Sequence, residues 1–188
     1  MSPVLHLLAG PNGAGKSTLV TEVLQPVTGL PFVNADEIAA RRWPDDQAAH
    51  AYDASRAAAD ERVRLLGEGR SFITETVFSH ASKVELVVDA AQRGYLVQLH
   101  VVMVPLGLSL CRVEERVARG GHDVPADKVR QRYARLWPLV AAAREVADST
   151  RFYDNAAARS PFRRVADFQR GRPVGTPAWP AWTPDVLR

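Results

Sequence analysis

Hydrophobic and polar positions follow two periods along the chain, one typical of buried strands and one typical of amphipathic helices. Short apolar runs bounded by turn-forming residues predict strands at residues 3–9, 31–35, 71–75, 95–104 and 150–155. Apolar residues that recur every three or four positions predict helices at residues 16–25, 45–66, 79–94, 109–121 and 125–147. Strands and helices therefore alternate along most of the chain.

This alternation predicts an α/β fold, in which a parallel sheet is covered by helices on both faces. A chain of 188 residues is long enough for one domain with a substantial core, so we expect a single domain over residues 1–188. Ser79 is expected to cap its helix and Gly94 to end it. The strand at 150–155 is expected to be the last, and the proline- and tryptophan-rich tail to wrap the surface.

The segment GPNGAGKST, residues 10–18, joins the first predicted strand to the first predicted helix and matches the phosphate-loop pattern G-x-x-x-x-G-K-[ST]. Its glycines let successive backbone N–H groups point at phosphate oxygens, and the helix that follows adds positive charge at its N-terminus. Lys16 can reach the β- and γ-phosphates, and the Ser17 hydroxyl is a hard ligand suited to Mg²⁺. The alternative is a glycine turn that binds nothing. The pattern predicts a P-loop NTPase fold that binds ATP or GTP with Mg²⁺.

The residues expected to hold the nucleotide come from the loop and from the end of the last predicted strand. They are Gly10, Pro11, Asn12, Gly13, Ala14, Gly15, Lys16, Ser17, Thr18 and Asn155.

Acidic residues follow the second and third predicted strands, at the sheet edge where parallel sheets bind ligands. Asp36 is either the N-cap of the next helix or the base that accepts a proton from a substrate hydroxyl. Glu75 is either an acid that orients Mg²⁺ or its waters or a strand-end carboxylate paired with an arginine. Thr76 can donate a hydrogen bond to a substrate oxygen.

Arg112, Arg116 and Arg119 are spaced by four and three residues and share one face of a predicted helix. A solvated basic face is the common meaning of such a stripe. This helix leads into GGHDVP, however, and the pattern favours a helical lid over residues 112–132 whose arginines stabilise charge on a transferring phosphate. We expect Arg116 and Arg119 to be catalytic, and His122 and Arg132 to contact substrate.

Composition narrows the function classes. The net charge of +3 suits a polyphosphate substrate, and the arginines are spread along the chain, so a nucleic-acid partner is disfavoured. Cys111 is the single cysteine, which excludes an internal disulfide; a buried thiol is expected. The chain shows no apolar run long enough to cross a membrane, so a cytoplasmic protein is expected.

The segments GPNGAGKST, NADEIA, ITETVFS, RVEERVARGGHDVPADKVRQRY and YDN occur in this order and together resemble the zeta-toxin family of phosphate-loop kinases. The resemblance covers most of residues 1–155. It implies transfer of phosphate from ATP with Mg²⁺ to a small molecule, which in the best-known members is the 3′-hydroxyl of the sugar in UDP-N-acetylglucosamine. It also implies a toxin–antitoxin system with a small antitoxin as partner.

The resemblance assigns roles residue by residue. Lys16 and Ser17 match the phosphate-loop lysine and hydroxyl, Asp36 the catalytic aspartate and Glu75 the substrate-side glutamate. Arg116 matches the first lid arginine, and Arg119 is the nearest candidate for the second. The longer toxins read Glu-Gly-Thr where this chain reads Glu-Thr-Val at residues 75–77.

Other functions remain open from the sequence. The acceptor can be another metabolite, an antibiotic or the 5′-hydroxyl of a nucleic acid, although no basic groove with interleaved aromatic residues is visible. An ABC-type ATPase is disfavoured because the chain lacks the LSGGQ signature. A module that binds nucleotide without turnover is disfavoured by the combination of Lys16, Asp36, Glu75 and the lid arginines.

Overall fold

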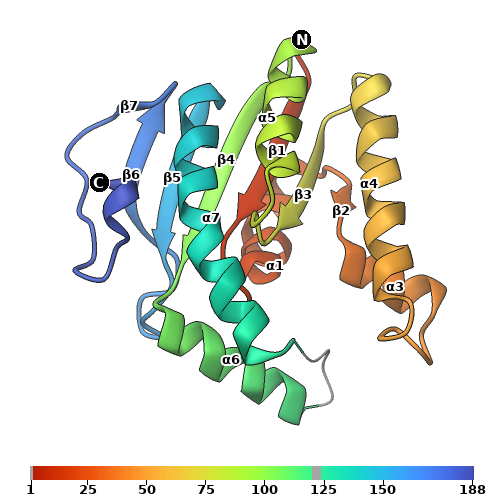
Figure 1. The fold of residues 1–188 in the computed structure, drawn as a ribbon. Helices are drawn as coiled ribbons and strands as arrows, with labels where there is room; N and C mark the ends of the chain where they lie inside the picture. The colour runs from red at the N-terminus through yellow and green to blue at the C-terminus, as the bar shows by residue number, and fades with distance from the viewer. Residues whose placement is uncertain (1, 120–123) are drawn as a thin grey trace.

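The computed structural model describes residues 2–119 and 124–188, which form one sheet with helices on both faces (Figure 1). The strands are β1 (Val4–Ala9), β2 (Phe32–Val33), β3 (Phe72–Thr76), β4 (Leu96–Met103), β5 (Ser149–Asp154), β6 (Arg163–Gln169) and β7 (Arg172–Pro173). The helices are α1 (Lys16–Leu19), the π-helix η1 (Val20–Leu24), α2 (Gln25–Thr28), α3 (Ala35–Arg42), α4 (Ala51–Gly67), α5 (Ser82–Gln92), α6 (Leu106–Ala118), α7 (Ala126–Val146) and the 3₁₀-helix η2 (Asp185–Leu187).

The sheet has the strand order β2-β3-β1-β4-β5-β6-β7, and the first five of these strands are parallel, as predicted. Figure 1 shows α4, α5 and α7 in front of the sheet, α1 behind it and α6 near the carboxyl ends of the strands. The central strands are apolar on both faces: Leu5, Leu7 and Ala9 join one core cluster and Leu8 joins the other. This two-sided burial explains the continuous apolar run of β1.

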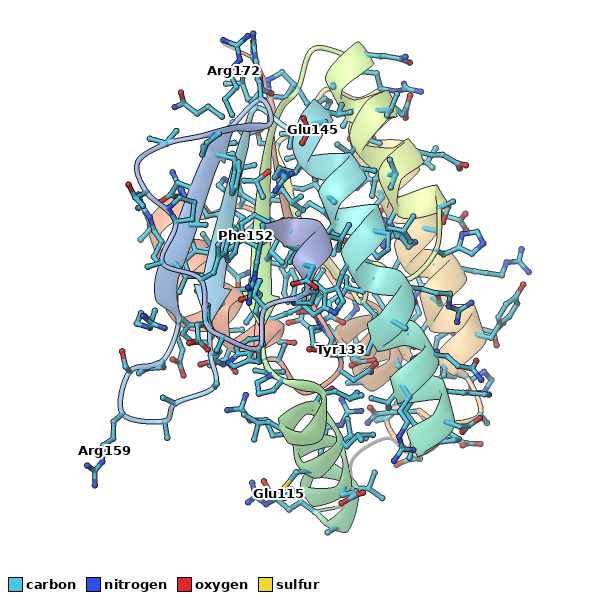
Figure 2. The ribbon with its side chains drawn as sticks, turned by 60° about the vertical axis from the view of Figure 1, so that its left-hand side comes forward. Glu115, Tyr133, Glu145, Phe152, Arg159 and Arg172 are labelled. Atoms are coloured by element: carbon cyan, nitrogen blue, oxygen red, sulfur yellow. The ribbon has the colours of Figure 1, made fainter. Side chains whose placement is uncertain are left out.

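The prediction that the strand at 150–155 is the last was wrong, because β6 and β7 extend the sheet as antiparallel strands. Charged residues interrupt the apolar pattern of β6, in which only Val165, Ala166 and Phe168 are buried. The sequence of this strand therefore lacks the apolar run that predicted the other strands. The tail does cover this edge. Figure 2 shows Phe152 of β5 in the interior beside the C-terminal segment, where its ring meets that of Trp179 at 5.0 Å between centroids.

Several predicted element boundaries also need correction. Residues 45–50 form turns, and α4 begins only at Ala51. Ser79 does not cap a helix, since α5 begins at Ser82 with Ala81 at the cap position. The predicted buried thiol of Cys111 is exposed, and its Sγ lies 3.6 Å from a carboxylate oxygen of Glu115. Within the described residues, no helix has the length and apolar character needed to cross a membrane.

The sheet buries a pair of histidines whose titration couples stability to pH. Nδ1 of His6 lies 3.1 Å from Nε2 of His100, and their rings are stacked. Burial, with smaller contributions from His6 and Arg151, lowers the pKa of His100 from 6.5 to about 3. Between pH 6.5 and about pH 3, His100 binds a proton in the unfolded chain but not in the folded protein. The free energy of unfolding therefore falls as the pH drops below 6.5.

We therefore expect the free energy of unfolding to fall by about 2 kcal/mol from His100 alone between pH 6.5 and about pH 5. Denaturant titrations at both pH values measure this loss. His100→Gln should reduce the loss, whereas His80→Gln, at an exposed position, should leave it unchanged. Equal acid sensitivity of the wild-type protein and His100→Gln would contradict the assignment.

Candidate active site

The phosphate loop lies between β1 and α1, and its lysine folds back on it. Nζ of Lys16 donates to the carbonyl oxygens of Gly10 at 3.1 Å and Pro11 at 3.0 Å. Burial lowers the pKa of Lys16, while the nearby carboxylates of Glu75 and Asp36 oppose the shift. The ammonium group is therefore held inside the loop, desolvated and close to the place where phosphate oxygens would bind.

Three side chains outside the loop hold its backbone. Ser109 donates to the carbonyl of Asn12 at 2.7 Å, and Arg112 donates to the carbonyl of Gly13 at 3.2 Å. Asn155 donates to the carbonyl of Ala14 at 2.8 Å and accepts from the backbone N–H of Phe162 at 3.3 Å. The loop is thus supported by α6 and by the residue that follows β5.

The contact of Asn155 with the loop leads to a prediction. Asn155→Ala leaves a buried carbonyl of the loop without its partner, which should cost about 1–3 kcal/mol of stability. Because the loop is less well held, we also expect nucleotide affinity to fall by about tenfold. Thermal unfolding and nucleotide titration measure the two effects. Unchanged values for both would show that Asn155 does not support the loop.

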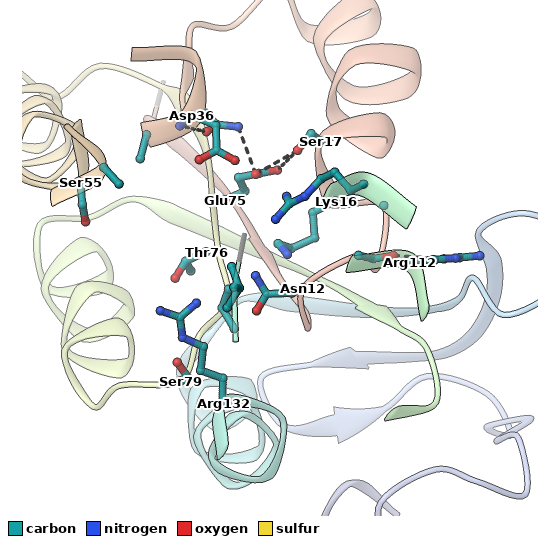
Figure 3. A pocket seen from close by; sticks show the side chains of 18 of the residues that line it. Asn12, Lys16, Ser17, Asp36, Ser55, Glu75, Thr76, Ser79, Arg112 and Arg132 are labelled. Carbon is teal, nitrogen blue, oxygen red and sulfur yellow. Dashed lines mark hydrogen bonds between the residues drawn. The ribbon is translucent and has the colours of Figure 1, made fainter. Parts of the chain in front are cut away.

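Ser17, Asn34 and Glu75 form a connected polar group at the edge of the loop (Figure 3). The Ser17 hydroxyl lies 2.9 Å and 3.0 Å from the two carboxylate oxygens of Glu75, and Asn34 donates to one of them at 3.0 Å. The sheet register brings them together, because Glu75 pairs with Leu8, two residues before the loop. Burial raises the pKa of Glu75, and the charge of Lys16 opposes this shift.

The donor set at Ser17 and Glu75 fits Mg²⁺, because both supply hard oxygen ligands and their oxygens already converge. Mg²⁺ usually keeps several waters and takes the remaining ligands from one or two protein groups and substrate phosphates. No cluster of three or more histidine, cysteine or acidic side chains suited to a metal occurs among residues 2–119 and 124–188. The site therefore suits a cation that arrives with a nucleotide.

Asp36 lies in the first turn of α3 and is exposed to the cleft. The interpretation of Asp36 as the N-cap was wrong: Asn34 is the cap, and its Oδ1 accepts from the backbone N–H of Asp36 at 2.7 Å. Asparagine before the helix satisfies the capping requirement. The Asp36 carboxylate has no capping role in the structure.

A cleft of about 950 Å³ brings most of the predicted site together. The predicted site residues that line it are Asn12, Gly13, Gly15, Lys16, Ser17, Thr18, Asp36, Glu75, Thr76, Arg116, Arg119 and Arg132. Gly10, Pro11, Ala14 and Asn155 do not line it; they lie within or behind the loop that they support. His122 lies outside the described residues.

Some residues of the cleft carry roles that the sequence did not reveal. The Thr76 hydroxyl accepts from the backbone N–H of Phe78 at 3.1 Å and so also shapes the turn after β3. Asn34 and Arg112 line the cleft, and Ser109 lies outside its lining. Asn34 holds the Glu75 carboxylate, and Ser109 and Arg112 hold the loop. Arg112 was predicted as a lid arginine and not as a support of the loop. For Arg112 the available signal was its spacing of four residues from Arg116.

The sheet, the loop and the cleft define a P-loop kinase-like protein. Residues 5–139 match the model of the family AAA_33, described as an AAA domain, and the chain belongs to this family.

This chain is similar to a curated relative and to a number of solved structures, three of which are described. An uncharacterized protein of Haemophilus influenzae is 29% identical over 125 residues, which cover 66% of this chain and 88% of the relative. The AvrRxo1-ORF1:AvrRxo1-ORF2 structure with sulphate ions has a TM-score of 0.70 at 19% identity and covers 92% of this chain. The aligned part is 60% of that protein's chain, so this chain spans less than two thirds of its length.

The PezAT chromosomal toxin–antitoxin system of Streptococcus pneumoniae has a TM-score of 0.60 at 14% identity, covering 88% of this chain and 72% of that one. A putative kinase from Chloroflexus aurantiacus has a TM-score of 0.55 at 18% identity, covering 72% and 79% of the two chains. At these identities the likeness shows a shared fold.

Proposed function

We propose that this protein is an ATP-dependent kinase that transfers the γ-phosphate to a hydroxyl group of a small molecule. The observation that carries the proposal is the shared cleft. It joins the phosphate loop to two carboxylates, Asp36 and Glu75, and to arginines from α6 and α7. The combination of Lys16, the two carboxylates and these arginines disfavours a module that only holds nucleotide.

Each residue has a role in the proposed transfer. Lys16 and the loop N–H groups bind the phosphates, and Asp36 accepts the proton of the acceptor hydroxyl. The acceptor oxygen forms a bond to the γ-phosphorus as the bond to the β,γ-bridging oxygen breaks and ADP leaves. Arg116 and Arg119 stabilise the charge on the transferring group. Ser17 and Glu75 would hold Mg²⁺, which neutralises phosphate charge when bound.

The resemblance to zeta toxins supports a finer version of this proposal. UDP-N-acetylglucosamine is then the first acceptor to test, and a small antitoxin is the expected partner. The PezAT and AvrRxo1 likenesses in fold are consistent with this version.

An acceptor screen tests the proposal. Purified protein is incubated with ATP and Mg²⁺, and ADP formation is followed with nucleotide sugars, sugars, aminoglycosides and a 5′-hydroxyl oligonucleotide. We expect one class to raise ADP formation well above the rate without acceptor. The 5′-hydroxyl oligonucleotide as the single active acceptor would replace the small-molecule proposal with a nucleic-acid kinase. No stimulation by any acceptor would contradict the proposal for these classes.

A further inference from the structure

The cleft extends well beyond the phosphate loop. Figure 3 shows Lys16 and Ser17 at one side and Ser55 and Ser79 at the other, with Glu75 and Thr76 between them. Arg62 of α4 and Lys83 of α5 line the same cleft as these serines, and α7 adds Lys128 and Arg132. We call Arg62, Lys83, Lys128 and Arg132 the basic cluster.

The lysines of this protein are concentrated in the cleft. The chain has only three, Lys16, Lys83 and Lys128, and all three line it. Among residues 2–119 and 124–188, eight basic side chains line the cleft against three carboxylates, so this lining has an excess of positive charge although the whole chain carries only +3. Lys16, Arg116 and Arg119 have a proposed role at the transferring phosphate. That role does not account for the basic cluster.

Arg62 and Lys83 are half-buried, and neither forms a hydrogen bond or ion pair with another residue within 2–119 and 124–188. Two arginines next to or beyond the cleft on the same helices show the contrast, because carboxylates pair with them. Arg64, two residues from Arg62 on the same helix, contacts Glu61 and Glu68 at 2.6 Å each. At the C-terminal cap of α5, Arg93 contacts Asp89 at 2.8 Å. Carboxylates therefore neutralise Arg64 and Arg93, whereas Arg62 and Lys83 in the cleft have no carboxylate partner among the described residues.

The two cations also disfavour one another. Burial lowers the pKa of Lys83, and the positive charge of Arg62 lowers it further. Burial likewise lowers the pKa of Arg62. Partly buried charges without partners are costly to the folded protein. An anion bound between these side chains would remove that cost.

We propose that the basic cluster binds an anionic oxygen group, a phosphate or a carboxylate, on the acceptor itself. This inference rests on the proposed kinase function and deepens it: the acceptor carries its own anionic group in addition to the hydroxyl that receives phosphate. Arg62 supplies a planar fork that matches either oxyanion, and Lys83 and Lys128 supply point charges. Ser55 and Ser79, which line the same cleft, add hydroxyl groups to this lining.

A binding experiment tests the cluster without any catalytic turnover. The phosphate loop is first saturated with a non-hydrolysable ATP analogue and Mg²⁺, and inorganic phosphate is then titrated by calorimetry. Losing one charged hydrogen-bond partner should weaken phosphate binding by about tenfold to a hundredfold in Arg62→Gln and in Lys83→Gln. Arg62→Lys should lie between wild type and Arg62→Gln. Arg56→Gln is the matched control, because Arg56 lies exposed on the same helix and does not line the cleft.

Equal phosphate affinity in wild type, Arg62→Gln and Lys83→Gln would overturn the proposal, and so would the lack of any binding to the nucleotide-saturated wild type. Thermal unfolding confirms that each variant is folded before its affinity is compared.

Matched acceptors then distinguish this inference from the proposed function. Each hydroxyl compound is offered as a neutral form, as its phosphate and as its carboxylate, for example a sugar, the sugar phosphate and the sugar acid. We expect an anionic form to have at least tenfold higher kcat/KM than the neutral one, with the preference lost in Arg62→Gln and Lys83→Gln.

Efficient transfer to neutral forms alone would overturn the inference and leave the kinase function standing. Phosphate binding that depends on Arg62 and Lys83, without transfer to any acceptor, would support the anion site and contradict the kinase function.

Discussion

Lys16→Met should reduce ATP-dependent turnover by about 10³-fold or more. Removing one donor placed at developing charge typically costs about 10²–10³ in rate, and Lys16 supplies a full charge from a desolvated position. Methionine keeps most of the side-chain volume. Among the described residues, the substitution removes the hydrogen bonds that Nζ donates to the carbonyls of Gly10 and Pro11 and the charge that faces Glu75. We therefore expect a folded protein that binds nucleotide weakly.

Steady-state turnover, nucleotide titration and thermal unfolding of the same preparation measure this prediction. Arg56→Gln is a suitable control for loss of an exposed basic residue. A folded Lys16→Met protein whose turnover stays within twofold of wild type would contradict phosphate binding by the loop.

Asp36→Asn should lower phosphate transfer by about 10²–10⁴-fold, the usual effect of losing a general base. Nucleotide affinity should survive, because Lys16 and the loop backbone carry most of it. Stability should change by no more than about 1 kcal/mol, since the substitution removes a charge near the helix N-terminus and leaves the Asn34 cap in place.

Glu37→Gln is the matched control, because Glu37 is the next residue of α3, is exposed and does not line the cleft. We expect its transfer rate to equal that of wild type. Near-normal transfer by Asp36→Asn would reject Asp36 as the base. Joint loss of transfer and of Mg²⁺-dependent nucleotide affinity would instead indicate that Asp36 helps to hold the metal.

The parallel part of the sheet was predictable because its strands are apolar on both faces and its helices have clear amphipathic periods. The antiparallel edge was not. In β6 only Val165, Ala166 and Phe168 are buried, and pairing with β5 and cover from the tail stabilise the strand. Local pattern carries no information about such non-local support.

The same distinction holds at the site. The phosphate loop and the two acids could be predicted because each follows a strand at the carboxyl edge of the sheet. The support of the loop by Ser109, Arg112 and Asn155 depends on contacts spanning 97, 99 and 141 residues, which no local motif encodes. Of the basic cluster, Arg132 was predicted to contact substrate. Arg62 and Lys83 were hidden, because they come from different helices and meet only in the cleft.

Movement of the γ-phosphate of ATP onto a hydroxyl group is the central feature of the proposed function. Its most direct measurement uses ATP labelled at the γ-phosphate, Mg²⁺ and the acceptor panel, and follows the label in product and in inorganic phosphate. We expect label covalently bound to an acceptor in wild type, and almost none with Lys16→Met or Asp36→Asn. Label released only as inorganic phosphate, at the same rate with and without every acceptor, would contradict the proposed transfer.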